Sequence, residues 1–333
     1  MPTKSLAELE AMVGDSRVTT EAFRIEAGKV AEFARAITSN DPVFRDTAAA
    51  ATRGYDRVPA PLTYSQVSRF PRHTPEGIEG TGFDLGFHPE YVLHGEQRHE
   101  YERPLFVGDI LEGTTTLTNV FQREGGRAGT MTVAHLETEY RDQHDDRVLT
   151  ERTTMLETES AVADEHTADD TAEPNGGAVT ADSDVPSPTG DGFERVRDLD
   201  GLAVGDSGPT VVVDDLERRH FVRYAGASGD FNPIHYDEPY ATAAGNETVF
   251  GQGMLTAGIT SRVVTRWFDL RDVTRFDVRF RSRVFPGDTV VATGEVAEID
   301  PDAGTVETAL EARTAADKTL LTGSATVDLS RGD

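Results

Sequence analysis

Residues 289–329 read TVVATGEVAEIDPDAGTVETALEARTAADKTLLTGSATVDL and contain three short runs with strand-like composition. The turn-forming segment Asp-Pro-Asp-Ala-Gly at 300–304 separates the first run from the second, and Ala316-Asp317 separates the second from the third. Short alternating runs between such turns predict an antiparallel meander. The expected strands are Thr289–Val296, Thr305–Thr314 and Thr319–Leu329.

A helix is expected ahead of this meander, between Gly253 and Phe268. Apolar residues recur there close to helical spacing, at Met254, Leu255, Ile259, Val263, Val264 and Trp267. Strand-like runs also occur in the first half of the chain, at Ile110–Phe121, Gly129–Arg141 and Val148–Leu156. A helix combined with antiparallel strands places the chain in the α+β class.

The two halves share short motifs, which indicates an internal repeat. The matching segments are Phe33-Ala34-Arg35 with Phe221-Val222-Arg223, and Phe106–Asp109 with Phe285–Asp288. Aligning Pro42 with Pro233 places Phe44 opposite His235, and the first half lacks the Gly-Asp-Phe segment that carries Asp230. We therefore expect the first half to have lost whatever proton-transfer site the second half has.

The amino-acid composition indicates the cellular environment and the partners to expect. The 333 residues carry a formal net charge of −27 with no cysteine, and Lys4, Lys29 and Lys318 are the only lysines. Such an acidic, lysine-poor surface is typical of proteins from a salt-loaded cytoplasm, as in haloarchaea, although an ordinary acidic protein remains an alternative. Nucleic acid is an unfavourable partner for this charge, and the absence of cysteine excludes disulfides.

Residues 157–192 contain mainly Ala, Thr, Asp, Glu, Gly, Ser and Pro. Low hydrophobicity with charge of one sign predicts a disordered tether. We therefore expect a first domain at 5–156, this acidic linker, and a second domain at 193–330. No run is apolar and long enough for a membrane span and no secretory h-region is found, so a cytoplasmic protein is expected.

The segment Gly229-Asp230-Phe231-Asn232-Pro233-Ile234-His235 places a carboxylate and an imidazole five residues apart on a turn. Asp230 and His235 can together move the two protons that addition of water to an activated double bond requires. The alternative is structural, with Asp230 capping the following turn and His235 as a hydrogen-bonded core imidazole.

This run resembles the signature of the MaoC-like (R)-specific enoyl-CoA hydratases, and the whole chain resembles fused 3-hydroxyacyl thioester dehydratases. The resemblance covers about residues 5–156 and 193–330 and is less specific in the first half. It implies a double hotdog fold, in which antiparallel sheets each wrap a long helix and the two hotdogs of one chain pair, leaving a further homodimer open. It also implies a noncatalytic first domain that widens the groove for a bulky acyl group.

Further site residues follow from the resemblance. Asn232 is expected to orient the pair or the water, with an Asx turn as the alternative. Gly253 opens the predicted helix and would supply a backbone N–H to the thioester oxygen, or else serve as a packing glycine. Ser261 would hydrogen-bond the imidazole of His235, or be a plain helix serine.

Arg279, Arg281 and Arg283 alternate in the segment RFDVRFRSRVF and would share one strand face. Such a row could hold the phosphates of coenzyme A or pair with surface carboxylates. His88, His94 and His99 are spaced by six and five residues, which fits no common ligand pattern, so we expect no metal. No phosphate-binding glycine loop is present and no cofactor is expected.

The expected activity is reversible hydration of trans-2-enoyl-CoA to (R)-3-hydroxyacyl-CoA, a hydro-lyase reaction of fatty acid metabolism. Two alternatives keep the chemistry and change the substrate, to an acyl-carrier-protein thioester or to a mesaconyl-CoA type of branched dicarboxylic enoyl-CoA. A third alternative is a noncatalytic acyl-CoA-binding module.

The charge generates a first prediction. We expect the melting temperature to rise as KCl increases from dilute to molar concentration, because salt screens the self-repulsion of a net charge of −27. Differential scanning calorimetry measures the effect, with a non-ionic osmolyte at matched osmolality as the control. A melting temperature that does not respond to KCl would rule out the halophilic interpretation.

Overall fold

The structure is a computed structural model that describes residues 2–69, 82–88, 91–125, 129–159 and 194–332. The linker expected at 157–192 therefore lies, from residue 160 onward, outside the described residues. Its first residue, Glu157, ends a strand.

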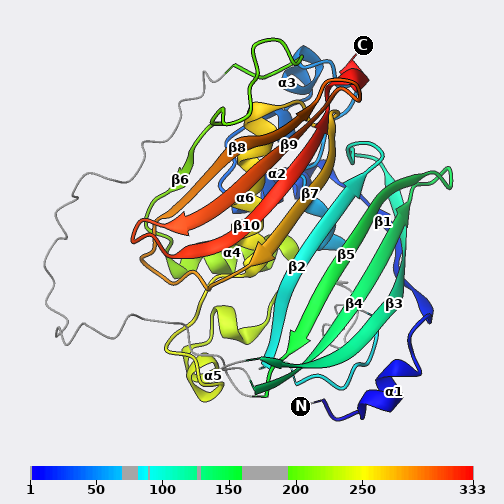
Figure 1. Cartoon of the computed structure of the whole chain (residues 1–333), viewed down its shortest axis with the longest axis vertical. Coiled ribbons are helices and arrows are strands. Elements are labelled where there is room, and N and C mark those ends of the chain that lie inside the picture. The colour runs from blue at the N-terminus through cyan, green and yellow to red at the C-terminus, as the bar shows by residue number, and fades with distance from the viewer. Residues whose placement is uncertain (1, 70–81, 89–90, 126–128, 160–193, 333) are drawn as a thin grey trace, which may run out of the picture.

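The ten strands of the described chain form one antiparallel sheet in the order β1-β3-β4-β5-β2-β7-β10-β9-β8-β6 (Figure 1). The first half supplies β1 (Ser16–Arg24), β2 (Val92–Tyr101), β3 (Ile110–Gly125), β4 (Gly129–Arg141) and β5 (Arg147–Glu157). The second half supplies β6 (Val211–Val213), β7 (Val273–Phe280), β8 (Val290–Asp300), β9 (Thr305–Thr314) and β10 (Thr319–Asp328). The halves join where β2 pairs with β7.

The expected strands are confirmed within a few residues at their ends, because they alternate inward apolar and outward polar side chains. β9 is the clearest case, with Val306, Thr308, Leu310 and Ala312 buried on one face. β1, β2 and β6 were not predicted, since polar residues interrupt β1 and β2 and β6 has only three residues.

Helices cover one face of the sheet (Figure 1). They are α1 (Leu6–Glu10), α2 (Ala27–Ala36), α3 (Thr47–Thr52), α4 (Arg218–Ser228), α5 (Glu238–Ala243) and α6 (Gly253–Trp267), with short 3-10 helices η1 (Pro42–Phe44), η2 (Tyr64–Arg69), η4 (Pro233–His235) and η5 (Leu329–Gly332). No helix in the described parts of the chain is long and apolar enough to cross a membrane. The predicted helix at 253–268 is confirmed as α6, which is buried along most of its length.

One hydrophobic core runs through both halves beneath the sheet. α2 packs against α4, where the rings of Phe33 and Tyr224 lie with centroids 5.8 Å apart. Two hotdog units packed in this way form a double hotdog, as expected. The pairing of the halves is therefore both a shared sheet and a shared core.

The repeat expected from the sequence appears in the local backbone. η1 and η4 both begin at a proline. In each, the residue before the proline caps the helix, and its side chain accepts a hydrogen bond from the N–H of the residue after the proline. Phe44 ends η1 as His235 ends η4, so the alignment is correct at this point. Asp41 faces Asn232 in that alignment, but both of its oxygens bind Arg53 at 2.8 Å.

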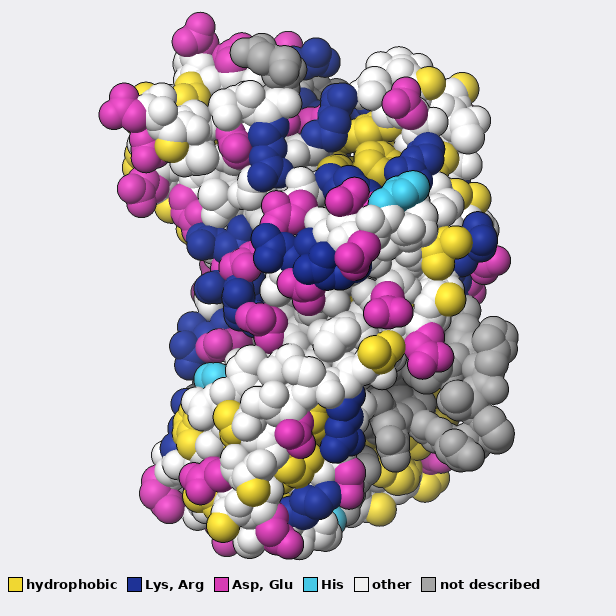
Figure 2. All heavy atoms as spheres, turned by 90° about the vertical axis from the view of Figure 1, so that its right-hand side faces the viewer, with side chains coloured by type: hydrophobic (Ala, Val, Ile, Leu, Met, Phe, Trp, Pro, Cys, Tyr) yellow, Lys and Arg dark blue, Asp and Glu magenta, His cyan; other side chains and the backbone are white. Residues whose placement is uncertain are grey.

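Ion pairs cover the outer face of the sheet across the junction between the halves. Arg98 of β2 contacts Asp277 of β7 at 2.6 Å, and Arg279 of β7 contacts Glu96 of β2 at 3.3 Å. Figure 2 shows arginines and carboxylates interleaved along the left edge of its view. Exposed pairs of this kind contribute little stability each, so the buried core is the main link between the halves.

The packing of α6 against the first half generates a second prediction. A Cβ on Gly258 would lie 2.4 Å from Cγ2 and 3.1 Å from Cβ of Ile37, whereas a Cβ on Gly226 of α4 would meet nothing within 4 Å. Both glycines are helical, so alanine gains about 1 kcal/mol of helix propensity at either position. We expect Gly258→Ala to lower the free energy of unfolding by about 1–3 kcal/mol through overpacking, and Gly226→Ala to raise or preserve it.

Chemical denaturation of the two variants measures this difference. Equal stability of Gly258→Ala and Gly226→Ala would show that α6 does not pack tightly against the first half.

Candidate active site

The turn that carries the expected acid–base residues begins where α4 ends. Gly229 ends the helix with a left-handed backbone, at φ 91°, which favours glycine. The Asp230 N–H then donates to the hydroxyl of Ser228 at 3.1 Å, and the Asn232 N–H donates to Oδ1 of Asp230 at 3.3 Å. These bonds hold the Asp230 carboxylate with its second oxygen directed at His235.

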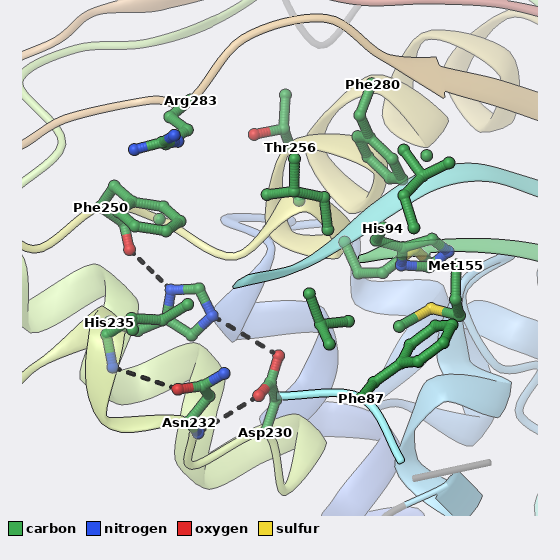
Figure 3. A pocket seen from close by; sticks show the side chains of 18 of the residues that line it. Phe87, His94, Met155, Asp230, Asn232, His235, Phe250, Thr256, Phe280 and Arg283 are labelled. Atoms are coloured by element: carbon green, nitrogen blue, oxygen red, sulfur yellow. Dashed lines mark hydrogen bonds and ion pairs between the residues drawn. The ribbon is translucent and has the colours of Figure 1, made fainter. Parts of the chain in front are cut away.

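His235 and Asp230 face each other without a direct hydrogen bond. His235 Nε2 lies 3.9 Å from Asp230 Oδ2, while Nδ1 lies 2.8 Å from the carbonyl oxygen of Phe250 (Figure 3). A carbonyl can only accept, so the Nδ1 proton is donated to it and the neutral ring keeps a lone pair at Nε2. Burial lowers the pKa of the His235 imidazole, even though the Asp230 carboxylate and the Phe250 carbonyl favour its charged form.

The pair opens into a cavity of about 670 Å³ whose wall comes from both halves of the chain. Figure 3 shows Asp230, Asn232 and His235 at one side and Phe87, His94 and Met155 at the other. Most of the wall between them is apolar and includes Ile234, Met254, Phe280, Leu85, Leu93 and Leu156. A water oxygen could sit at about 2.8 Å from both Nε2 and Oδ2, since two such distances span 3.9 Å.

The N-terminus of α6 also faces this cavity. Gly251, Gly253, Met254 and Thr256 line it, and Gln252 makes no side-chain cap because its amide donates to the carbonyl of Phe221. The first N–H groups of a helix have no partner within the helix. A Cβ on Gly253 would lie 3.2 Å from the ring of Phe280, so the glycine also keeps the cavity open here.

Asn232 forms the Asx turn that was its alternative role, and its role in orienting the pair or the water stays a prediction. Its side-chain oxygen accepts from the N–H of Ile234 at 3.2 Å, which is the Asx turn, and the residue also lines the cavity.

The prediction for Ser261 is wrong. Its hydroxyl donates to the carbonyl of Gly258 at 2.8 Å within α6, and it does not line the cavity. The Phe250 carbonyl occupies the position at Nδ1 of His235 that Ser261 was expected to fill.

The three arginines do not form one row. β7 ends at Phe280, so the alternation that begins at Arg279 does not continue, and Arg279 pairs with Glu96 outside the cavity wall. Arg281 and Arg283 do line the cavity. The guanidinium of Arg283 lies 4.9 Å from the ring centroid of Phe250, beside the imidazole site.

The three histidines considered as ligands are not gathered around a metal site. His88 contacts Glu157 at 2.7 Å, His94 stacks near Phe280, and His99 is buried beside Glu151. Within the described ranges, no three histidine, aspartate or glutamate side chains come together in a way that could hold a metal ion.

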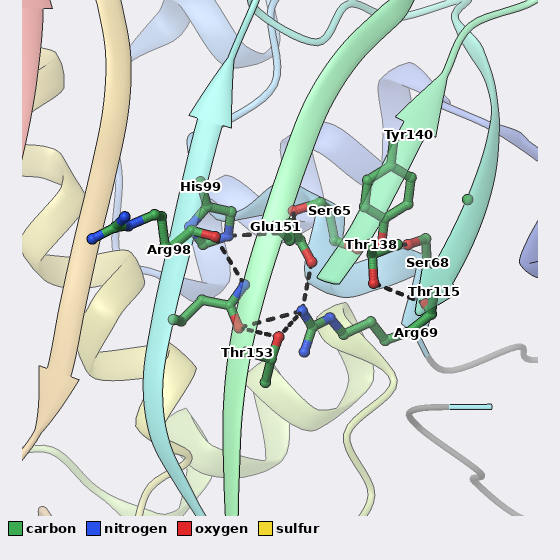
Figure 4. Close-up of polar contacts among 12 residues, drawn as sticks. Ser65, Ser68, Arg69, Arg98, His99, Thr115, Thr138, Tyr140, Glu151 and Thr153 are labelled. Carbon is green, nitrogen blue, oxygen red and sulfur yellow. Dashed lines mark hydrogen bonds and ion pairs between the residues drawn. The ribbon is translucent and has the colours of Figure 1, made fainter. Parts of the chain in front are cut away.

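A buried polar network beside the cavity was missed in the sequence (Figure 4). Arg69 Nη2 contacts Glu151 at 2.5 Å, Thr153 at 2.7 Å and Gln97 at 3.3 Å. Burial opposes ionisation of Glu151, but the charges of Arg69 and His99 and the hydrogen bonds from Ser65 and Arg69 together lower the pKa of the carboxyl. Glu151 lies on the same strand face as the buried Leu149, and a carboxylate at an inward position was the signal available in the sequence.

Comparisons with known proteins find matches for both halves of the chain. Residues 11–151 match the FAS1-like dehydratase domain region, and residues 205–316 match the MaoC like domain. A UPF0336 protein of Thermobifida fusca is 33% identical over 116 residues, which are 33% of this chain and 71% of that protein. The mouse peroxisomal multifunctional enzyme type 2 is 36% identical over 92 residues, which are 27% of this chain and only 12% of that enzyme.

Solved structures extend the likeness over the whole chain. A MaoC-like dehydratase is 27% identical with a TM-score of 0.74, covering 96% of this chain and 99% of that one. A conserved hypothetical protein of Mycobacterium tuberculosis with a double hotdog fold has a TM-score of 0.61 at 16% identity, covering 95% of this chain and 96% of that one, which bears on the fold alone.

The fold and the site define a double hotdog protein with a buried imidazole facing a partly buried carboxylate in a largely apolar cavity. The chain combines a FAS1-like dehydratase region in its first half with a MaoC like domain in its second, and it belongs with the UPF0336 proteins. The matches to dehydratase domains support hydratase or dehydratase chemistry in general terms.

Burial of His235 generates a third prediction. Because burial lowers the pKa of its imidazole, the unfolded chain takes up this proton first as the pH falls. The stability linked to this group is complete above about pH 6.5 and decreases below it, by at most about 1.4 kcal/mol per pH unit, until the folded protein is protonated as well. We expect His235→Gln to reduce this slope, measured by denaturant unfolding at a series of pH values.

The matched control is His144→Gln, which changes an exposed histidine in the turn between β4 and β5 and should leave the slope as it is. An unchanged slope in His235→Gln would mean that this imidazole is not buried in the folded protein.

Proposed function

We propose that this protein reversibly hydrates trans-2-enoyl-CoA to (R)-3-hydroxyacyl-CoA. The observation that carries the proposal is the position of Asp230 and His235 on one wall of a cavity into which the N-terminus of α6 also points. A water-activating pair and a set of N–H donors are the two features that addition of water to an unsaturated thioester needs.

We assign both proton transfers to His235 in this proposal. With Nδ1 bonded to the Phe250 carbonyl, Nε2 of neutral His235 takes a proton from water as the water oxygen bonds to C3 of the substrate. The negative charge moves through C2 to the thioester oxygen, and the imidazolium then returns a proton to C2. Asp230 orients the water and stabilises the imidazolium from 3.9 Å.

The thioester oxygen needs donors while it carries the developing charge. The N–H groups at the start of α6, with Gly253 first among them, are the donors that we assign to it. Asn232 lines the same wall and completes the group by fixing the turn that holds the pair.

The phosphates of coenzyme A require cationic side chains, whereas the acyl group requires an apolar wall. Arg281 and Arg283 line the cavity near His235 and are the residues that we assign to the phosphates or pantetheine of the carrier. The apolar wall supplied by the first half, with Phe83, Leu85 and Phe87, would accommodate the acyl chain. The first domain therefore serves binding in this proposal, and chemistry stays in the second.

The fourth prediction tests the pair itself. We expect Asp230→Asn and His235→Ala each to lower kcat/KM for but-2-enoyl-CoA by about 10²- to 10⁴-fold, because the first removes the charge that stabilises the imidazolium and the second removes the group that moves the protons. Turnover is followed by the loss of absorbance of the conjugated thioester in high salt, with chiral analysis of the product. Circular dichroism and melting curves establish that the variants fold.

Phe44→Leu is the control, because Phe44 occupies the position of His235 in the first half. It should retain most of the turnover of but-2-enoyl-CoA. Near-normal activity of either folded variant of the pair would exclude the mechanism, and tight binding of the substrate without turnover by the wild-type protein would favour an acyl-CoA-binding module.

A further inference from the structure

The cavity has a second polar end that the proposed chemistry does not use. Gln66 and Arg69 of η2 and His94 of β2 line the wall supplied by the first half, whereas Asp230 and His235 line the wall supplied by the second. Residues three apart lie on the same side of a 3-10 helix, so Gln66 and Arg69 present their side chains together. Apolar residues alone would be enough if this wall held only a hydrocarbon chain.

Gln66 is the member of this group with unused hydrogen-bonding capacity. Gln66 is 5% exposed and lines the cavity, and its side-chain amide makes no hydrogen bond to the described residues. The amide atoms are not enclosed by protein, so they face the cavity, where a water molecule or a group from a ligand can bond to them. The amide offers a donor and an acceptor, which suits a hydroxyl or a carbonyl oxygen.

The neighbouring charges limit what this end can bind. Arg69 is balanced by Glu151, which it contacts through Nη2 at 2.5 Å, so the pair is neutral as a unit. His94 is neutral as well, because burial and then the charge of Arg69 lower the pKa of its imidazole to about 3. A second carboxylate would therefore enter this wall without a free countercharge, which is costly in a buried site.

We propose that the first half recognises an uncharged oxygen function, a hydroxyl or carbonyl, on the part of the acyl group that lies far from the thioester. This inference rests on the proposed function and names its substrate class. In this proposal Gln66 makes the direct contact with the oxygen function. The network of Arg69, Glu151 and Gln97 makes the wall polar, and because it is neutral it does not attract an anion. A purely hydrocarbon tail would leave the Gln66 amide unsatisfied.

The test compares saturated acyl-CoAs of equal length that end in a methyl, a hydroxyl or a carboxylate group, over a series of chain lengths. Their dissociation constants are measured by calorimetry on the full chain in high salt. At the best length we expect the hydroxyl form to bind about tenfold more tightly than the methyl form, equivalent to about 1.4 kcal/mol, and the carboxylate form to bind most weakly. Equal or tighter binding of the methyl or carboxylate form at every length would overturn the proposal.

Gln66→Leu should abolish the preference for the hydroxyl form, and Gln122→Leu is the matched control. Gln122 lies on β3, where its amide contacts Thr132 at 3.2 Å, and it does not line the cavity. A preference that survives in folded Gln66→Leu would overturn the assignment to this residue. If Gln66→Leu does not fold, Gln66→Met and the wild-type comparison decide the question.

These measurements need no turnover, so they separate this inference from the proposed hydration. Absence of turnover with every enoyl-CoA would refute the proposed function while the binding series still tests the distal wall. Turnover of but-2-enoyl-CoA without any preference among the three tails would refute the inference alone.

Discussion

The pairing of β2 with β7 is the contact on which the rest of the molecule depends. Five residue pairs, from Glu96 opposite Arg279 to Glu100 opposite Arg275, join two five-stranded sheets that would otherwise each have an exposed edge there. The same pairing sets His94 against Phe280, with ring centroids 5.0 Å apart in the wall of the cavity. The cavity therefore exists only when the two halves are joined, and neither half supplies its whole wall.

The two halves share the same turn backbone, but the side chains on that turn have different electrostatic environments. In the first half Asp41 is neutralised by Arg53 and the position of the imidazole is filled by the core residue Phe44. In the second half His235 has a backbone carbonyl at one nitrogen and a carboxylate 3.9 Å from the other. A carboxylate held by arginine cannot readily serve as a base, so the same turn is structural in one half and suited to proton transfer in the other.

Local patterns in the sequence were sufficient where local physics decides the structure. The alternation in Thr305–Thr314 and the spacing of apolar residues in α6 follow from which face is buried, and the structure agrees with both. The run from Gly229 to His235 is similarly local, because its turn is built from bonds between residues two apart.

The failures occurred where the outcome depends on distant partners. Ser261 was expected to bond an imidazole, but its hydroxyl donates to a carbonyl one helical turn back. Serine in a helix commonly bonds such a local acceptor. Arg279 forms an ion pair with Glu96 on another strand and does not line the cavity. No spacing in the sequence reveals this pairing. The network around Arg69 combines residues from η2, β2 and β5, so only the folded sheet brings it together.

α6 connects stability with the proposed chemistry. Its middle is buried against the first half at Gly258 and Ile37, while its first turn, without a side-chain cap, faces the cavity. The packing of the middle therefore fixes the direction of the N–H groups at the start. Donors that are held rigidly need not reorganise when charge develops on a substrate oxygen, and this is the main source of electrostatic stabilisation in such sites. The close contact at Gly258 thus also orients the end of the helix that faces the cavity.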